Sequence, residues 1–132
     1  MNILLLSSEV AGIMKSGGLA DVAKALPLQL QAEGHDVRVV MPCYTTIKDY
    51  DKLEVIAHGV LNENNPDEKL RIPYSIRKTY LNKVVEVWLV ECPRYFDRTS
   101  MYGDNNQAYA DNGERFAFFS AAALDACKHL NY

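Results

Sequence analysis

A lysine followed by two adjacent glycines is the part of this chain best suited to hold an anion. Lys15, Gly17 and Gly18 lie between a short apolar run, residues 3–6, and the start of a helical pattern. In a strand, loop and helix of this kind, backbone N–H groups and the helix dipole commonly meet a phosphate. Glycine has no Cβ, so the backbone can adopt a positive φ and approach a ligand oxygen closely, and lysine adds a mobile charge. The loop therefore predicts a phosphate site.

The sequence excludes two common phosphate motifs and leaves a simple turn open. A P-loop needs Gly-Lys-Ser/Thr at the helix start. This chain instead has Leu19, Ala20 and Asp21 there, and a carboxylate repels phosphate. The dinucleotide fingerprint Gly-x-Gly-x-x-Gly is also absent. On the local pattern alone, a glycine pair that only makes a tight strand-to-helix turn remains an alternative.

The first third of the chain predicts a strand, a helix and a second strand. Residues 2–8 begin with four apolar residues and are expected to form a central strand covered on both faces. A helix is expected over residues 18–33, with Ser16 as N-cap and Gly34 just after its end. The valine-rich residues 36–41 form the next strand, parallel to the first. The residues expected to form one buried stripe on the helix are Leu19, Val22, Ala23, Leu26 and Leu30.

The remaining chain predicts a hairpin, a long loop and a final helix. Residues 74–80 alternate in polarity and turn into the apolar residues 84–90, which is typical of a hairpin leading into a buried strand. Residues 93–110 form a long loop whose tyrosines, amides and carboxylates suit a carbohydrate acceptor. Helical spacing then predicts a helix over residues 111–131.

Several polar positions have a simple structural interpretation beside a functional one. Glu9, in the loop after the first strand, is interpreted as a solvated carboxylate rather than a ligand contact. Asp21 has a favourable position near a helix amino end. Asp111 and Glu114 are three residues apart and fit a capping box. Residues 43–51 read as a polar loop.

Composition limits the class of protein. The 132 residues suffice for one domain, and 14 basic against 17 acidic side chains give a formal charge of −3. Nucleic acid and anionic membrane partners are therefore not expected. Cys43, Cys92 and Cys127 match no metal-ligand pattern and are interpreted as reduced thiols. No apolar run is long enough for a signal peptide or a bilayer span, so we expect a soluble, cytoplasmic protein.

A series of longer motifs extends from the glycine loop almost to the end of the chain. It comprises Lys15-Ser16-Gly17-Gly18-Leu19-Ala20-Asp21-Val22, Leu26-Pro27, Gly34-His35-Asp36-Val37-Arg38-Val39-Val40-Met41-Pro42-x-Tyr44, Tyr95-Phe96-Asp97-Arg98, Tyr102-Gly103 and Tyr109-x-Asp111-Asn112-x-x-Arg115-Phe116. In order and spacing, this series resembles the amino terminus of bacterial glycogen synthases and plant starch synthases. It is far more specific than two glycines. One departure is Gly12, where that family often has proline.

The resemblance implies an incomplete Rossmann-like α/β fold, a mostly parallel sheet plus a β-hairpin, as in the amino-terminal domain of a GT-B glycosyltransferase. It implies transfer of glucose from ADP-glucose to the non-reducing end of an α-1,4-glucan such as glycogen, with retention and without a metal or cofactor. The residues carried over from the family are Asp21, close to the reacting sugar, and Tyr95, Asp111 and Asn112, at the acceptor. The loop chemistry given above places Lys15, Gly17 and Gly18 at the donor phosphate, and Lys15 and Asp21 are expected to be the catalytic residues.

Under this interpretation, residues 1–132 are a truncated, acceptor-side domain. A further strand is expected after the last helix, and a missing C-terminal domain is expected to hold most of the nucleotide site. The chain alone is then expected to be inactive. Two alternatives remain open: another GT-B glucosyltransferase that uses UDP-glucose, and a non-catalytic phosphate- or glycan-binding module.

Overall fold

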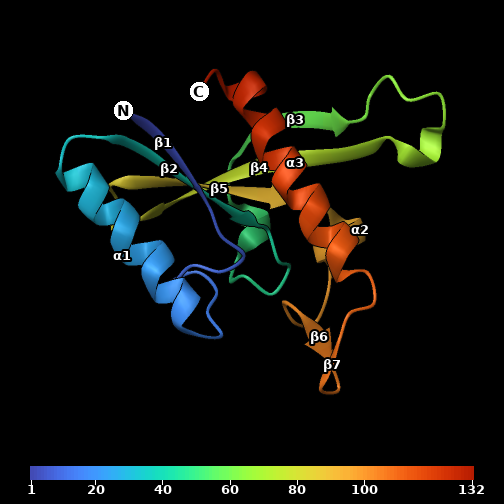
Figure 1. Cartoon of the computed structure of the whole chain (residues 1–132), viewed down its shortest axis with the longest axis horizontal. Coiled ribbons are helices and arrows are strands. Elements are labelled where there is room, and N and C mark those ends of the chain that lie inside the picture. The colour runs from blue at the N-terminus through green and yellow to red at the C-terminus, as the bar shows by residue number, and fades with distance from the viewer.

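A five-stranded sheet forms the centre of the computed structural model, which describes all 132 residues. Its strands, in the order β1-β2-β5-β4-β3, are Asn2–Leu6, Asp36–Pro42, Val85–Glu91, Ile72–Leu81 and Val55–Leu61. β2 is parallel to β1 and β5, whereas β4 is antiparallel to β5 and to β3. Only β4 therefore runs against the others, which confirms the predicted mostly parallel sheet with a β-hairpin (Figure 1).

Two long helices pack on this sheet. α1 (Gly18–Ala32) connects β1 to β2 and contacts β2 and β5, and α3 (Asn112–Leu130) contacts β3, β2 and β5. The remaining elements are the short helices η1 (Tyr50–Lys52), η2 (Glu68–Leu70) and α2 (Pro93–Phe96), and a small hairpin of β6 (Gly103–Asp104) and β7 (Gln107–Ala108). None of the helices is both long enough and apolar enough to cross a bilayer.

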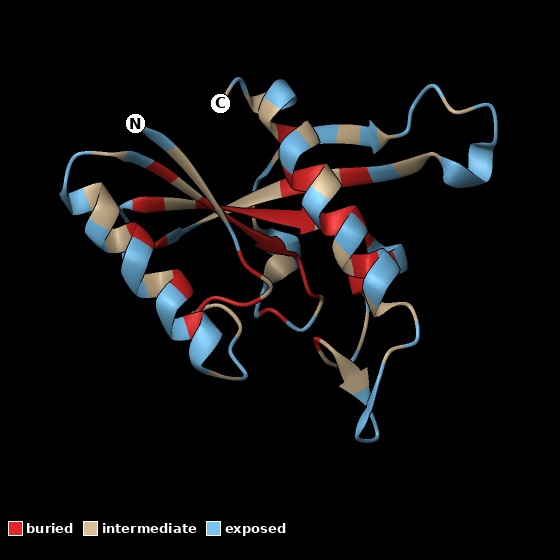
Figure 2. Ribbon diagram, in the orientation of Figure 1, coloured by how far each residue is buried: buried red, intermediate tan, exposed pale blue.

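Strand alternation explains why both faces of the sheet are covered. Trp88 on β5 points to the α3 side, where its ring lies 5.5 Å from that of Tyr132 in a T-shaped pair. Its neighbours Val87 and Leu89 point to the opposite face and are fully buried. Figure 2 shows the resulting buried centre in β2 and β5, with α1 and α3 on different sides of it.

The predicted buried stripe of α1 is largely wrong: of its five residues only Ala23 is buried, and Leu30 is partly buried. The residues of α1 that are buried are Ala20, Ala23 and Pro27, and these small side chains bring the helix close to the sheet. Leu19, Val22 and Leu26, which the sequence placed in the core, are exposed. Helical spacing identified a set of apolar positions but could not tell which flank of that set faces the sheet.

Two further predictions, about β1 and about the start of α1, are wrong. β1 pairs with β2 alone, so it is an edge strand of this sheet rather than a central one, and its apolar residues are only partly buried. Ser16 is not the N-cap of α1, because Gly17 occupies that position. The predicted end of α1 is confirmed: Gly34 has φ +93°, and its N–H and that of His35 donate to carbonyls of the last turn.

The two segments predicted as loops are more ordered than expected. In the segment after β2, Cys43, Tyr44 and Ile47 are buried, so this segment is part of the core and not a polar loop. The Tyr44 ring packs edge-on against Phe96 of α2, with 5.9 Å between the ring centroids. Residues 93–110 contain α2 and the β6–β7 hairpin and are therefore not a single irregular loop.

Phe118 provides a test of where the core lies. Its ring is buried and lies 5.0 Å from the ring of Tyr95 and 6.3 Å from that of Tyr74. Phe118→Ala should lower the free energy of unfolding by about 3 to 5 kcal/mol through lost burial and a cavity. Leu124→Ala, at an exposed position of the same helix, is the matched control and should change it by less than about 0.5 kcal/mol. Chemical denaturation measures both, and equal losses would contradict this packing.

Candidate functional site

The loops that follow β1, β2 and β5 meet at one edge of the sheet, because these strands are parallel and end on the same side. The Tyr44 hydroxyl donates to the Ser8 carbonyl at 2.7 Å, which ties the second loop to the first. The Thr45 N–H donates to the Phe96 carbonyl, which ties the second loop to α2. Residues far apart in the sequence are thus held together at this edge.

The buried carboxylate of Glu9 organises the loop after β1. Its side chain accepts hydrogen bonds from the Gly17 N–H at 3.0 Å, the Ser16 N–H at 3.3 Å and the Ser16 hydroxyl at 2.6 Å. The Tyr102 hydroxyl donates a fourth, at 2.7 Å. Glu9 is 2% exposed, so the prediction of a solvated carboxylate is wrong. The sequence signal was a carboxylate directly after a strand and a few residues before a glycine loop, where free amides can satisfy it.

The hydrogen bonds keep Glu9 ionised despite its burial. Desolvation raises the pKa of this carboxyl group, and the hydrogen bonds from Ser16, Tyr102 and Gly17 together outweigh it, so the pKa lies below its usual value. The pKa of the Tyr102 hydroxyl is shifted in the opposite direction. Burial, and then the nearby Glu9 carboxylate, raise the pKa of Tyr102 to about 12, so this group stays protonated and donates.

Lys15 and Asp21, predicted as catalytic residues, form an ion pair. The Lys15 ammonium donates to both carboxylate oxygens of Asp21, at 2.8 and 2.9 Å. The two side chains are 49% and 57% exposed, so the pair lies at the surface and is open to a ligand. An ammonium has three N–H groups. One of those of Lys15 therefore remains available to a third oxygen.

The backbone N–H groups of Gly17 and Gly18 differ in whether they have an acceptor. The Gly17 N–H is already held by Glu9, whereas the N–H groups of Gly18 and Leu19 have no acceptor in the structure. Gly17 has φ −160°, an extended conformation, and neither glycine has a positive φ, so that part of the prediction is wrong. A Cβ at either position would meet nothing within 4 Å. The glycines thus leave open space in front of the first turn of α1 for an anion to approach.

The backbone conformation at position 12 explains why this chain has glycine there and not proline. It has φ +91°, which a proline ring cannot adopt because it fixes φ near −65°. The turn between Val10 and Met14, which form an isolated bridge, therefore has a different backbone from a turn with proline.

The three residues carried over as acceptor contacts lie together near the start of α3, and each has a structural partner. Tyr95 is buried, and its hydroxyl donates to Glu114 at 2.6 Å. Asp111 accepts two hydrogen bonds from Arg98, at 3.1 and 2.7 Å. The Asn112 amide donates to the Tyr102 carbonyl at 2.8 Å. None of the three contacts Lys15 directly, and their predicted role at the acceptor remains a prediction.

The predicted capping box at α3 is wrong. Asp111 does occupy the N-cap position, but its side chain makes no capping hydrogen bond. Its carboxylate is bound by Arg98, and that of Glu114 by Tyr95, so both carboxylates serve the neighbouring loop instead of the helix end.

A buried arginine supports this cluster and was assigned no role from the sequence. The Arg115 guanidinium donates to the carbonyls of Tyr95 and Met101, at 2.7 and 2.9 Å, and to the Asn112 side chain at 2.8 Å. Its charge also faces the Phe96 ring. Burial lowers the pKa of Arg115. The residue thereby fixes both ends of the segment that leads into the β6–β7 hairpin.

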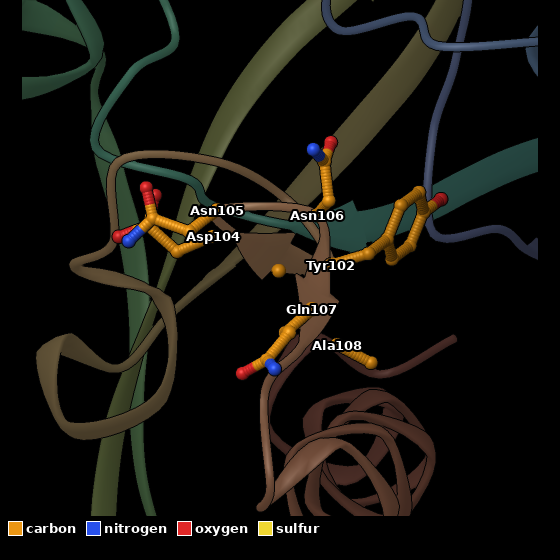
Figure 3. A pocket seen from close by; sticks show the side chains of 7 residues that line it. Tyr102, Asp104, Asn105, Asn106, Gln107 and Ala108 are labelled. Atoms are coloured by element: carbon orange, nitrogen blue, oxygen red, sulfur yellow. The ribbon is translucent and has the colours of Figure 1, made fainter.

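A polar hollow of about 400 Å³ runs along that hairpin. It is lined by Tyr102, Gly103, Asp104, Asn105, Asn106, Gln107 and Ala108. In Figure 3, Asp104 and Asn105 point away from the Tyr102 ring, and Asn106 and Gln107 project from the hairpin in other directions, so amide and carboxylate groups are spread along the hollow beside one aromatic ring. No group of three or more His, Cys, Asp or Glu side chains is arranged to hold a metal ion.

Comparison with known proteins gives a consistent result. Residues 2–132 match the family model described as the starch synthase catalytic domain. Glycogen synthases of Aeromonas salmonicida and Vibrio vulnificus are 53% and 50% identical to this chain over its whole length. The fold is similar to that of the catalytic domain of starch synthase IV from Arabidopsis thaliana bound to ADP and acarbose, with a TM-score of 0.72 at 24% identity over 98% of this chain.

The matched region is a part of each of these proteins. The chain spans 26% of the length of both glycogen synthases and 25% of the starch synthase chain.

The Asp111–Arg98 pair predicts a pH dependence of stability. The hydrogen bonds from Arg98 lower the pKa of Asp111 below its usual 3.8. A carboxylate whose pKa is lowered by folding stabilises the protein above the unfolded pKa, and this contribution is lost as the pH falls through the folded pKa. Asp111→Asn should therefore flatten the fall in thermal unfolding midpoint below about pH 4. Asp104→Asn, at an exposed hairpin carboxylate, should follow the parent curve. A parent and an Asp111→Asn variant with parallel curves would contradict the assignment.

Proposed function

Because this chain belongs to the starch synthase catalytic domain family, we propose that it is the amino-terminal, acceptor-side part of a two-domain glycogen synthase of the GT-B type. The proposed reaction is transfer of glucose from ADP-glucose to the non-reducing end of an α-1,4-glucan, with retention at the anomeric carbon. The chain would form one wall of the cleft, and a second domain in the remaining length of its relatives would supply most of the nucleotide site.

The observation that carries this proposal is a group of hydrogen-bond donors without a full set of acceptors at the edge of the sheet. A surface ammonium, Lys15, lies in the loop that leads into a helix whose first two N–H groups, those of Gly18 and Leu19, have no acceptor. These groups suit a phosphate oxygen. The starch synthase neighbour was solved with ADP bound, and ADP carries phosphates of this kind.

The catalytic contribution would be stabilisation of the leaving group. When the bond between glucose and the nucleotide breaks, negative charge grows on the distal phosphate, and donors directed at that charge lower the barrier. The helix dipole would contribute about 0.3 to 2 kcal/mol. A lysine about 4 Å from a phosphate oxygen has a gross attraction on the order of 4 kcal/mol per unit charge at an effective dielectric constant near 20. Lys15 would therefore be the larger contributor.

Asp21 would act by positioning that ammonium. Its two oxygens hold Lys15 in one place before a ligand arrives, so less side-chain freedom is lost when a phosphate binds. It also offsets part of the lysine charge, which lowers the gross attraction given above. We therefore assign the direct phosphate contact to Lys15 and not to Asp21.

The acceptor would lie toward the β6–β7 hairpin. The polar hollow there offers the amide and carboxylate partners that sugar hydroxyl groups need. Asn112 and Asp111 would then act mainly by holding this hairpin and its supporting loop, through Tyr102 and Arg98. The buried Tyr95 would serve the same purpose from beneath.

Removal of the Lys15 ammonium tests the anion site. In a full-length glycogen synthase that carries this chain as its amino-terminal part, hereafter the intact enzyme, Lys15→Ala should lower kcat/KM for ADP-glucose about 30- to 1,000-fold. This range corresponds to a net loss of about 2 to 4 kcal/mol of transition-state stabilisation. Glucan elongation assays with labelled ADP-glucose provide the measurement.

Lys83→Ala is the matched control for this substitution. Lys83 is exposed in the turn between β4 and β5, at the end of β5 away from the proposed site. Its loss should leave kcat/KM unchanged within about twofold. A Lys15→Ala loss below about threefold would remove Lys15 from the phosphate site.

The 132-residue chain by itself should form no glucan from ADP-glucose, because the proposed donor site needs a second domain. Elongation of maltooligosaccharides by the purified chain would contradict this.

Calorimetric titration of the same chain with ADP and with maltooligosaccharides addresses the alternative of a non-catalytic binding module. That alternative requires binding by the chain together with no transfer by the intact enzyme. Competition between ADP-glucose and UDP-glucose on the intact enzyme addresses the choice of donor.

A further inference from the structure

We propose that Glu9 is a positioning residue that fixes the Lys15–Gly17 segment and couples it to the β6–β7 hairpin through Tyr102. This inference rests on the proposed function, since it concerns how the proposed phosphate loop is held. It assigns Glu9 no contact with either substrate.

Glu9 itself has a fixed position. Its backbone is bound by Ser7, whose hydroxyl donates to the Glu9 carbonyl at 2.7 Å. Ser7 is buried, and its own N–H donates to the Val40 carbonyl of β2 at 3.0 Å. The carboxylate therefore projects from a point that is continuous with the central sheet.

The Lys15–Gly17 segment has few attachments other than Glu9. Residues on either side are well held, because Val10 and Met14 exchange backbone hydrogen bonds and the Ala11 N–H donates to the Ala20 carbonyl. Within residues 15–17, the two backbone N–H groups that are bound, those of Ser16 and Gly17, both donate to Glu9. Without Glu9, this segment would keep only the surface pair of Lys15 with Asp21 and the turn at the start of α1.

Tyr102 connects Glu9 to the β6–β7 hairpin. Tyr102 lies immediately before β6, and its hydroxyl reaches both Glu9 and the Ser8 hydroxyl, each at 2.7 Å. The Tyr102 carbonyl is held by Asn112 at the start of α3. One tyrosine thus joins the proposed acceptor side to the proposed donor side, with Glu9 as the shared partner.

A displacement of this loop should have a large effect on the reaction. A shift of about 1 Å in a positioning group can lower the rate of catalysis about 100-fold. Such a shift would move Lys15 relative to the phosphate without removing any group that contacts it. The activity should then depend on the geometry that Glu9 imposes and not on its charge.

The amide of glutamine separates these two roles. Its oxygen can accept from the Ser16 and Gly17 N–H groups, and its NH₂ can donate to the hydroxyls of Ser16 and Tyr102, which can also accept. Glu9→Gln therefore keeps the four contacts without the charge, whereas Glu9→Ala removes them all.

The test uses the intact enzyme. We expect Glu9→Ala to lower kcat/KM for ADP-glucose about 100-fold, and Glu9→Gln to remain within about threefold of the parent. The matched control is Glu33→Ala, at an exposed carboxylate near the end of α1, which should have no effect. A Glu9→Gln variant as impaired as Glu9→Ala would overturn the proposal, because the charge would then be what matters. A Glu9→Ala variant with full activity would overturn it as well.

A second substitution keeps the test decisive if Glu9→Ala does not fold. Tyr102→Phe removes one hydroxyl and keeps the ring. It should lower kcat/KM for ADP-glucose about 3- to 10-fold and still unfold in one cooperative thermal transition. Tyr80→Phe, at an exposed tyrosine of β4, is its control. An unchanged kcat/KM for ADP-glucose in Tyr102→Phe would contradict the coupling.

The outcomes separate this inference from the proposed function. If the parent intact enzyme transfers no glucose, the proposed function fails. If the parent is active and the Glu9 and Tyr102 variants behave as their controls, only the positioning role fails.

Discussion

The constraint on which the site depends is the burial of one carboxylate. A buried carboxylate is stable in its ionised form only if donors surround it. Glu9 obtains them from the glycine loop and from Tyr102. The loop is therefore folded around the carboxylate. The N–H of Gly18 has no acceptor because it lies in the first turn of α1, where N–H groups have no partner within the helix.

The sheet determines which segments can meet at this carboxylate. Since β1, β2 and β5 are parallel, their following loops lie at one edge, and α3 returns to the same edge with its amino end. The buried Arg115 then closes the arrangement by binding the carbonyls of Tyr95 and Met101. Glu9 thus holds the glycine loop, and Arg115 holds the segment between Tyr95 and Met101, each through hydrogen bonds to main-chain or hydroxyl groups.

The sequence predicted four strands of the main sheet, the two long helices and the lysine–glycine loop, because these depend on local periodicity and on glycine chemistry, but it did not predict β3 (Val55–Leu61). It also brought Lys15 and Asp21 into one site through the family resemblance. It failed where a long-range partner decides the outcome. Glu9 looked like a surface carboxylate because its partner Tyr102 is distant in the sequence. Asp111 looked like a helix cap because it is three residues before Glu114, but its carboxylate is bound by Arg98 instead. The exposed face of α1 was misassigned because helical spacing does not identify the side that meets the sheet.

The phosphate role of the Lys15 loop is tested most directly by a crystal structure of the intact enzyme with ADP. We expect the distal phosphate oxygens at hydrogen-bond distance, about 3 Å, from the Lys15 ammonium and the Gly18 N–H, with the Glu9 contacts unchanged. An ADP molecule bound entirely by the other domain, with Lys15 paired to Asp21 alone and the first turn of α1 facing solvent, would contradict it.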